Sequence, residues 1–304
     1  MKGGRTMRKH GWFKILPLVL FLVGLPAVGA ARDIAPIVST AWLRANLSMP
    51  GLVIVDVRKV EQYREGHVPG AVNAFYRAWA FKRGDLYTEI PEEDDLFDLV
   101  GSIGLSRDSR VVVYGRTDTL RECFHATRVA CTMKYAGLVN VAILDGGFNK
   151  WVQEKRAVSQ TVTRAEERPY KGAVRKDMFV NKAYVLKNYD RLVLLDVREP
   201  DYFIGKRKLD CIDQAGRLPG AINLPTSWAF TPERTFKSKE QLTVLADAAV
   251  GTDRSKEIIT YCDTGQCCPT WALILREILG YPNVRLYDGA LQEWMHDPQA
   301  PVIK

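Results

Sequence analysis

The stretch Leu52-Val-Ile-Val-Asp56-Val-Arg58 decides the fold of this chain, because a close copy, Leu192-Val-Leu-Leu-Asp196-Val-Arg198, stands in the second half. Each copy is a short aliphatic run that ends on an Asp and an Arg. Such a run is typical of a buried β-strand, and the polar residues after it mark the start of a loop. The chain therefore contains the same strand and loop twice.

Three further motifs recur in the same order. Val68-Pro-Gly-Ala-Val-Asn73 returns as Leu218-Pro-Gly-Ala-Ile-Asn223, Val111-Val-Val-Tyr114 as Ile258-Ile-Thr-Tyr261, and Leu144-Asp-Gly-Gly147 as Tyr287-Asp-Gly-Ala290. A repeat in unchanged order indicates one fold written twice. The strand-like runs alternate with helical patterns, such as residues 126–135 and 239–250. Each copy is therefore predicted to be an α/β domain, a mainly parallel sheet with helices on both faces.

The repeat also predicts the domain limits. We expect a first domain at residues 33–154 and a second at residues 176–304. Residues 155–175 between them are polar and charged, follow no helical or strand period, and contain Pro169 and Gly172. That composition is typical of a linker.

Residues 1–30 read as a signal peptide. They contain five basic residues and no acidic one, followed by an apolar stretch at 15–28 and small residues up to Ala31. The stretch is shorter than the ~20 apolar residues that span a bilayer. We therefore expect cleavage near Ala31 or Arg32 and a periplasmic or extracellular mature protein. An uncleaved membrane anchor is the alternative.

The net charge and the number of cysteines limit the kinds of binding partner that the protein can have. The whole chain has a formal net charge of +8, and loss of the leader leaves about +3, which is too small and too scattered to favour nucleic acid or a membrane surface. We expect no stable membrane contact after leader removal. The 6 cysteines are too few for a disulfide scaffold over this length. No second Cys/His pair stands at zinc-ligand spacing, so neither a metal nor a cofactor is expected.

Cys262 is the candidate reactive residue. It follows the strand-like run 257–261 and opens the loop Cys262-Asp-Thr-Gly-Gln-Cys267, and a helical pattern begins at about Cys268. A strand, a Gly-bearing loop and a helix N-terminus bring backbone N–H groups and the positive end of the helix dipole to the sulfur. Such a cradle lowers a thiol pKa and holds a thiolate or persulfide. The alternative is a buried core cysteine at a strand end.

The combined motifs resemble those of the tandem rhodanese sulfurtransferases. They are Asp-Val-Arg, Pro-Gly-Ala-x-Asn, Tyr-Cys-x-x-Gly and Tyr-Asp-Gly, and they cover nearly all of the chain after the leader. The resemblance implies that residues 176–304 form the catalytic copy, with Cys262 carrying sulfane sulfur as a persulfide. It also implies a first copy without a nucleophile, and Gly115 stands where Cys262 stands in the second.

The implied reaction is sulfur transfer from a small-molecule donor to a thiol or cyanide acceptor, with ping-pong turnover. The loop residues around the persulfide are Asp263, Thr264, Gly265, Gln266 and Cys267. Asp196 and Arg198 end the neighbouring strand, at the edge where open α/β sheets bind ligands. They either brace the loop or contact the substrate.

The loop departs from the family pattern in its charge. Thiosulfate-using members of the family often place cationic residues just after the cysteine. Asp263 stands there instead and would repel a dianion by ~1 kcal/mol or more at short range. Residues 202–205 also lack the carboxylate-binding arginine of the mercaptopyruvate branch. The donor therefore stays open.

The loop also departs from the pattern in its cysteines. Cys267 either forms a resolving disulfide with Cys262 or lines the pocket, and Cys268 is expected to pack at the helix start. An exported thiol-redox or metalloid-handling protein is thus an alternative function, and a non-catalytic persulfide-binding module is a third. A phosphatase of related fold is disfavoured, because Cys268 stands where its catalysis needs an arginine.

The remaining candidate residues are assigned structural roles. They are Cys123 and Cys131 in the core of a helix, His67 and Arg217 at turns, and His125 and His296 in packing or at the surface.

Overall fold

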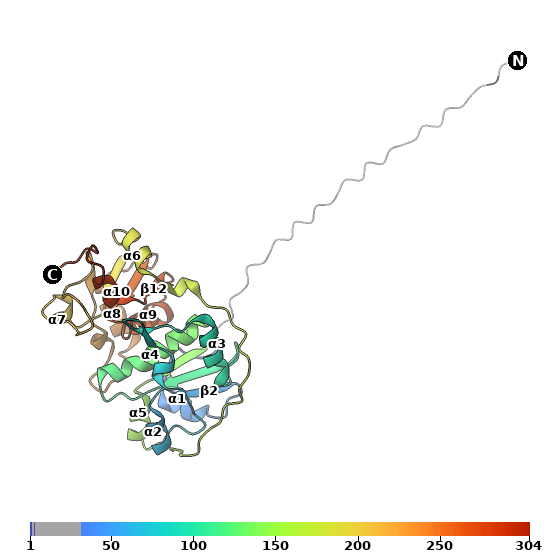
Figure 1. The fold of residues 1–304 in the computed structure, drawn as a ribbon. Coiled ribbons are helices and arrows are strands. Elements are labelled where there is room, and N and C mark those ends of the chain that lie inside the picture. The colour runs from blue at the N-terminus through green and yellow to red at the C-terminus, as the bar shows by residue number, and fades with distance from the viewer. Residues whose placement is uncertain (2, 4–31) are drawn as a thin grey trace. The chain divides into compact units, whose positions relative to one another are not determined.

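The computed structural model describes Met1, Gly3 and residues 32–304 (Figure 1). Apart from Met1 and Gly3, the predicted leader at residues 1–30 lies outside the described residues. Within the described part, no helix combines the length and the apolar character needed to cross a membrane. Residues 32–304 form one compact unit.

Two five-stranded parallel sheets organise this unit. The first has the strand order β1-β7-β6-β2-β3, and the second has the order β10-β9-β11-β12-β8. Read in reverse, the second order is the first one repeated. The strands of the first sheet are β1 (Ile37–Val38), β2 (Leu52–Asp56), β3 (Val72–Asn73), β6 (Arg110–Tyr114) and β7 (Val141–Leu144). Those of the second are β8 (Phe179–Val180), β9 (Val193–Asp196), β10 (Ile222–Asn223), β11 (Ile258–Tyr261) and β12 (Val284–Tyr287). The predicted fold class, two copies of a parallel α/β domain, is confirmed.

Register shows how closely the copies correspond. Asp56 on β2 pairs with Tyr114 on β6, and Asp196 on β9 pairs with Tyr261 on β11. The next residues along β6 and β11 are Gly115 and Cys262, so the two loops begin at the same edge of their sheets.

Helices cover the sheets. In the first copy they are α1 (Thr40–Ala45), α2 (Val60–Glu65), α3 (Glu93–Ser102), α4 (Leu120–Tyr135) and α5 (Gly147–Gln153), with a 3-10 turn η1 (Tyr76–Ala78) and a hairpin of β4 (Phe81–Arg83) and β5 (Leu86–Glu89). In the second they are α6 (Lys182–Asn188), α7 (Pro200–Phe203), α8 (Lys239–Val250), α9 (Cys268–Leu273) and α10 (Ala290–Met295), with η2 (Lys176–Met178), η3 (Thr226–Ala229) and a π-helical turn η4 (Ile274–Ile278).

Helix α4 is longer than the periodicity indicated. The apolar pattern marks residues 126–135, whereas the helix begins at Leu120. Thr119 and Glu122 form a reciprocal capping box that starts the helix. The added residues 120–125 mix polar and apolar side chains, because Arg121, Glu122 and His125 line a cavity while Cys123 packs in the core. This mixture interrupts the apolar period that marks residues 126–135.

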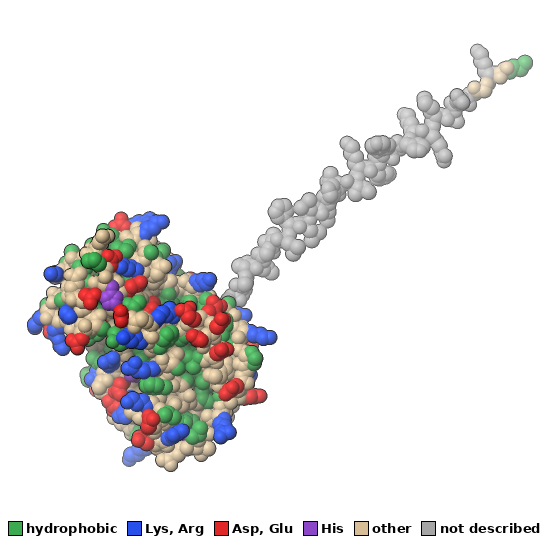
Figure 2. All heavy atoms as spheres, viewed as in Figure 1, with side chains coloured by type: hydrophobic (Ala, Val, Ile, Leu, Met, Phe, Trp, Pro, Cys, Tyr) green, Lys and Arg blue, Asp and Glu red, His purple; other side chains and the backbone are tan. Residues whose placement is uncertain are grey.

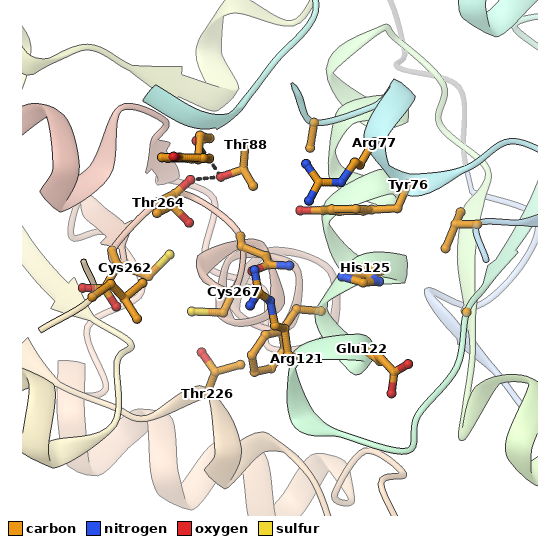
Figure 3. Close-up of a pocket in the computed structure, with 18 of the residues that line it drawn as sticks. Tyr76, Arg77, Thr88, Arg121, Glu122, His125, Thr226, Cys262, Thr264 and Cys267 are labelled. Atoms are coloured by element: carbon orange, nitrogen blue, oxygen red, sulfur yellow. Dashed lines mark hydrogen bonds between the residues drawn. The ribbon is translucent and has the colours of Figure 1, made fainter. Parts of the chain in front are cut away.

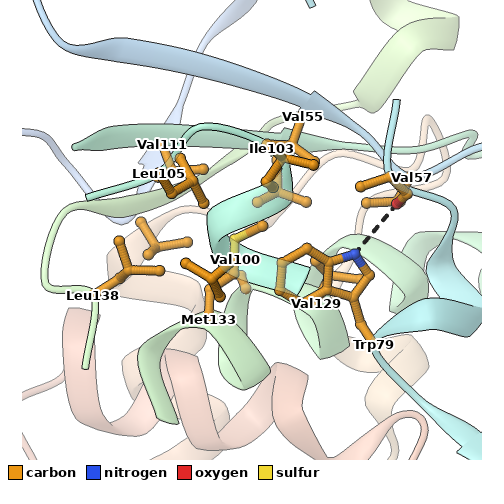
Figure 4. Packing of buried hydrophobic residues seen from close by; sticks show 14 of the residues in the cluster. Val55, Val57, Trp79, Val100, Ile103, Leu105, Val111, Val129, Met133 and Leu138 are labelled. Carbon is orange, nitrogen blue, oxygen red and sulfur yellow. Dashed lines mark hydrogen bonds between the residues drawn. The ribbon is translucent and has the colours of Figure 1, made fainter. Parts of the chain in front are cut away.

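The core of each copy lies between its sheet and these helices. Figure 4 shows Trp79 among Val57, Val129 and Met133 in the first copy, with its indole N–H donating to the Ala74 carbonyl at 3.3 Å. Helix α4 packs against α9 of the second copy. At that contact the Thr127 and Thr270 hydroxyls hydrogen-bond at 2.9 Å.

The connecting segment at residues 155–175 has no helix and no regular strand. His67 lies fully buried and fastens this segment, since its ring nitrogens lie 2.7 Å from the Tyr63 carbonyl and 3.1 Å from the Thr161 carbonyl. Its backbone also pairs with Ser159. His67 therefore does more than shape a local turn. Arg217 pairs in the same way with Ile303 near the C-terminus.

Candidate active site

Cys262 lies at the carboxyl end of β11, at the floor of a cavity of about 850 Å³ (Figure 3). We call this space the Cys262 cavity. The loop Asp263–Cys267 borders it, and α9 begins at the next residue. All six cysteines are free thiols. Figure 3 shows the sulfurs of Cys262 and Cys267 in the same region of the cavity, above Thr226.

Three thiols share this end of α9. Burial alone would raise the pKa of Cys262, but hydrogen bonds from the Cys267 and Cys268 thiols and from their backbone N–H groups hold it well below its usual range. The pKa of Cys267 is raised by its hydrogen bond to Cys262 and by burial, and that of Cys268 by burial and the same bond. Only one of the three thiols ionises readily. The trio therefore holds a single thiolate, on Cys262.

Asp196 and Arg198 form a buried brace beneath the loop. Their side chains pair at 2.7 Å, and both residues are almost fully buried. Arg198 also donates to the Gly216 carbonyl at 2.8 Å and to the Asp263 carboxylate at 3.3 Å. These three acceptors engage much of the guanidinium, which leaves it poorly placed to bind substrate. Bracing is thus the role that the geometry favours.

Asp263 is less negatively charged than the sequence predicted, which was a fully ionised carboxylate beside the sulfur. Burial raises the pKa of its carboxyl to about 7, despite the opposing effect of Arg198. At neutral pH about half of the carboxyls are protonated. Repulsion of an anionic donor is correspondingly weaker than the sequence suggested.

The first copy contributes cavity-lining residues that the sequence did not identify as part of the site. Tyr76 and Arg77 from η1, Thr88 from β5, and Arg121 and His125 from α4 all line the Cys262 cavity. His125 stacks on the Tyr76 ring with centroids 4.0 Å apart, which is the packing role that the sequence predicted, and it also lines the cavity. These residues lie on separate elements and meet only through tertiary packing. Their one local signal is the spacing of Arg121 and His125, a helical turn apart.

Contacts from the first copy also hold the catalytic loop. Arg128 is fully buried and donates to the Gly265 carbonyl at 3.1 Å and to the Asp288 carboxylate at 2.7 Å. Gln292 makes two hydrogen bonds of 2.9 Å to the backbone of Tyr87. The Thr88 hydroxyl donates to the carbonyl of Thr264. Gln266 and Cys267 complete the loop on the cavity side.

Several predicted residues lie away from the chemistry. Cys123 and Cys131 are buried in α4, and burial raises the pKa of each to about 11. His296 lies 3.7 Å from Asp213 and does not line the Cys262 cavity. Gly115 does line the cavity, but it offers no side chain for attack. Among residues 1, 3 and 32–304, no group of three His, Cys, Asp or Glu side chains is arranged to hold a metal ion.

Comparisons with known proteins agree with this architecture. The family model described as "Rhodanese-like domain" matches residues 39–154 and again residues 181–297. The chain belongs to the rhodanese-like family and carries the domain twice in tandem.

Curated relatives share nearly the whole chain. A protein of Mycobacterium leprae named "Putative thiosulfate sulfurtransferase" is 35% identical over 274 residues, which cover 85% of this chain and 94% of that one. The "Sulfur carrier protein TtuD" of Thermus thermophilus is 30% identical over 285 residues, 88% of this chain and 96% of that one. This tandem protein is thus a sulfurtransferase of the rhodanese-like family.

Solved structures show the same fold. The anaerobic ergothioneine biosynthesis enzyme from Chlorobium limicola superposes with a TM-score of 0.76 at 22% identity, covering 88% of this chain and 69% of that one. The wild-type structure of EanB superposes with a TM-score of 0.78 at 22% identity, covering 88% and 68%. At this identity the likeness concerns the fold.

Proposed function

We propose that the protein moves sulfane sulfur from a small anionic donor to a thiol or cyanide through a persulfide on Cys262. The observation that carries this proposal is the position of Cys262, which directly follows β11, lines the Cys262 cavity and has a pKa held below its usual range. The thiolate form is stabilised by hydrogen bonds from the Cys267 and Cys268 thiols and from their backbone N–H groups. It therefore suits a nucleophile that is ionised before substrate arrives.

In the first step the Cys262 thiolate attacks the outer sulfur of the donor. With thiosulfate, a new sulfur–sulfur bond forms, the old one breaks, and sulfite leaves with the bonding electron pair. The products are Cys262–S–S⁻ and sulfite, so charge and atoms balance. The backbone N–H groups that stabilise the thiolate lie where they also stabilise the persulfide anion.

In the second step an acceptor thiolate attacks the outer sulfur of the persulfide. The sulfur–sulfur bond to Cys262 breaks, its electron pair stays on the Cys262 sulfur, and the acceptor leaves as a persulfide. Cyanide reacts in the same way and leaves as thiocyanate. Since the donor remnant has left before the acceptor binds, one cavity serves both steps.

The test is the intact mass of the purified protein after exposure to thiosulfate. A gain of about 32 Da, one sulfur atom, marks the persulfide. We expect Cys262→Ser to show no gain and no turnover, because the attacking atom is lost. Cys123→Ala, with its change buried in α4 away from the cavity, is the matched control and should load as the wild type does. Sulfur transfer at near wild-type rate by Cys262→Ser would refute the proposal.

A redox role for Cys267 is a second candidate, favoured by its hydrogen bond to Cys262. Oxidation would join the two sulfurs as a disulfide, remove the nucleophile and stop transfer until reduction. The Cys267→Ser variant keeps a hydroxyl donor, so it should retain activity under reducing conditions and lose sensitivity to mild oxidants. Equal sensitivity in both proteins, with no 262–267 cross-link in a peptide map, would leave Cys267 as a pocket-lining residue.

We also propose that the protein works outside the cytoplasm, in the periplasm or beyond the cell. The support for this is the basic, apolar and small-residue order of residues 1–30. Within this proposal, residues 33–154 form the non-catalytic copy and residues 176–304 form the catalytic copy.

A further inference from the structure

The Cys262 cavity is larger than a small inorganic donor requires. Its volume of about 850 Å³ lies in the range of pockets that enclose organic molecules. The loop around Cys262 occupies one side, and Figure 3 shows Tyr76, Arg77 and His125 on the opposite side. A ligand that contacts both sides must therefore carry an organic group beyond its reacting sulfur.

The two walls of the cavity differ in charge. The lining cations of the first copy that have no ion-pair partner in the part of the chain the structure describes are Lys59, Arg77, Lys82 and Arg121. The lining acids without an ion-pair partner within the same residues, Glu199 and Asp210, belong to the second copy. The first-copy wall therefore presents uncompensated positive charge to a ligand.

Tyr76 is the buried polar group at the centre of this wall. Its residue is 6% exposed and lines the cavity, yet its hydroxyl has no hydrogen-bond partner in the described structure. The side chain of Gln266 lies close enough to the phenol to lower its pKa, but the two groups do not reach hydrogen-bonding geometry. A buried hydroxyl without a partner is costly, unless a ligand or a water completes it.

The neighbours of Tyr76 define the ligand group that fits. Burial raises the pKa of the phenol to about 12, so it remains a proton donor at neutral pH. Arg121 precedes His125 by one turn of α4, and Arg77 follows Tyr76 directly in η1. Burial, followed by the charges of Arg121 and Arg77, lowers the pKa of His125 to about 4, so the ring stays neutral. Two guanidinium groups and a phenol together match a carboxylate.

We propose that the first-copy wall is the acceptor subsite and that it selects organic thiols that carry a carboxylate. The carboxylate is bound by Arg77 and Arg121 and receives a hydrogen bond from Tyr76, while the thiol end reaches the Cys262 persulfide. This inference rests on the persulfide mechanism proposed above. It gives the copy without a nucleophile a direct role in substrate choice.

The transfer itself is balanced without a further reactant. The acceptor thiolate RS⁻ attacks the outer sulfur of Cys262–S–S⁻. The RS–S bond forms as the bond to Cys262 breaks, which yields RS–S⁻ and the Cys262 thiolate. The carboxylate takes no part in the bond changes, so its binding acts on the affinity and orientation of the acceptor.

The experiment compares two acceptors that differ in one group. Protein is loaded with thiosulfate, freed of donor and mixed with 3-mercaptopropionate or with 2-mercaptoethanol. Loss of about 32 Da from the intact protein, the mass of one sulfur atom, gives the rate of the second step alone. The ratio of the two second-order rate constants, corrected for the thiolate fraction of each acceptor, measures selectivity for the carboxylate.

We expect the ratio to fall roughly tenfold in the double variant Arg77→Gln/Arg121→Gln, since each exposed guanidinium contributes only a few-fold. Tyr76→Phe, which keeps the ring and its stack on His125, should lower the ratio several-fold. Arg107→Gln is the matched control, because Arg107 is exposed and lies outside the cavity.

An unchanged ratio in the double variant and in Tyr76→Phe, with loading intact, would overturn this inference and leave the proposed function standing. A wild-type protein that never gains the sulfur mass would overturn the proposed function and the inference together. A fall in the ratio of equal size in Arg107→Gln would also overturn the inference, because it would trace the effect to overall charge.

Discussion

At the scale of single residues, the proposed nucleophile, Cys262, is stabilised by two neighbouring thiols. Cys262 is ionised although it is buried, because Cys267, Cys268 and their backbone N–H groups donate hydrogen bonds to its sulfur. The Arg198 guanidinium is engaged by Asp196, the Gly216 carbonyl and Asp263. The site therefore stabilises a negative sulfur with dipoles, which would also stabilise the charge of the proposed persulfide.

Asp263 makes the first step depend on pH. Burial raises the pKa of its carboxyl to about 7, so the group gains negative charge as the pH rises through that value. His125, with a pKa lowered to about 4, does not titrate in this range. We expect the rate constant for loading by thiosulfate to fall about five-fold between pH 6 and 8, the effect of ~1 kcal/mol of repulsion.

The measurement is rapid mixing with thiosulfate over this pH range, followed by intact mass. Asp263→Asn keeps an oxygen for Arg198 and carries no charge, so its profile should be flat above pH 6. The same fall in the Asn variant would assign the pH dependence to another group.

At the scale of elements, the loop is held by segments that are distant in the sequence. Helix α4 sends Arg128 to the Gly265 carbonyl and to Asp288. The β4–β5 hairpin contacts the loop at Thr264 and α10 at Gln292. A loop fixed at several points loses less conformational entropy when it binds a persulfide or a substrate.

Substitution of Gly265 by alanine tests how closely the loop is packed. Its φ is +80°, and an added Cβ would lie 2.9 Å from the Asp288 carbonyl oxygen. Gly280 has a φ of +74° with nothing within 4 Å of an added Cβ. Gly280→Ala should cost about 1–2 kcal/mol of unfolding free energy through backbone strain alone.

Gly265→Ala should cost more than that, and it should also slow the loading of Cys262 because the loop must shift. Urea unfolding and the loading rate, measured on both variants, separate strain from displacement. If the two variants lose equal stability and both load at the wild-type rate, the close packing of Gly265 has no part in the site.

At the scale of the whole molecule, the two copies of the fold contribute different residues to the site. Both copies keep the buried Asp–Arg pair at the strand end, at 2.6 Å for Asp56 and Arg58 and 2.7 Å for Asp196 and Arg198. Only the second copy has a thiol at the matching loop position, that of Cys262, where the first copy has Gly115. The first copy contributes cavity wall and loop contacts, so an isolated second copy would lose the contacts of Arg128 and Thr88 to its loop and that of Tyr87 to α10. Lys and Arg side chains are interspersed with acidic ones on the face drawn in Figure 2.

Export is a prediction for the whole chain. The order of basic, apolar and small residues predicts a mature protein that begins near Ala31 or Arg32. N-terminal sequencing of the protein recovered from periplasmic or culture fractions should find that start. Recovery of the protein from the membrane fraction with residues 1–30 still attached would instead show an anchor.

The sequence by itself determined the duplicated parallel fold and placed Cys262 and Gly115 at matching positions. It could do so because strand periods, Pro-Gly turns and the strand–loop–helix pattern are local, and each element carries its own signal. The tertiary structure alone decided the charge of Asp263, the hydrogen bonds of Arg128 and the first-copy wall of Tyr76, Arg77, Arg121 and His125. Those properties depend on burial and on contacts between elements far apart in the chain, which no local pattern encodes.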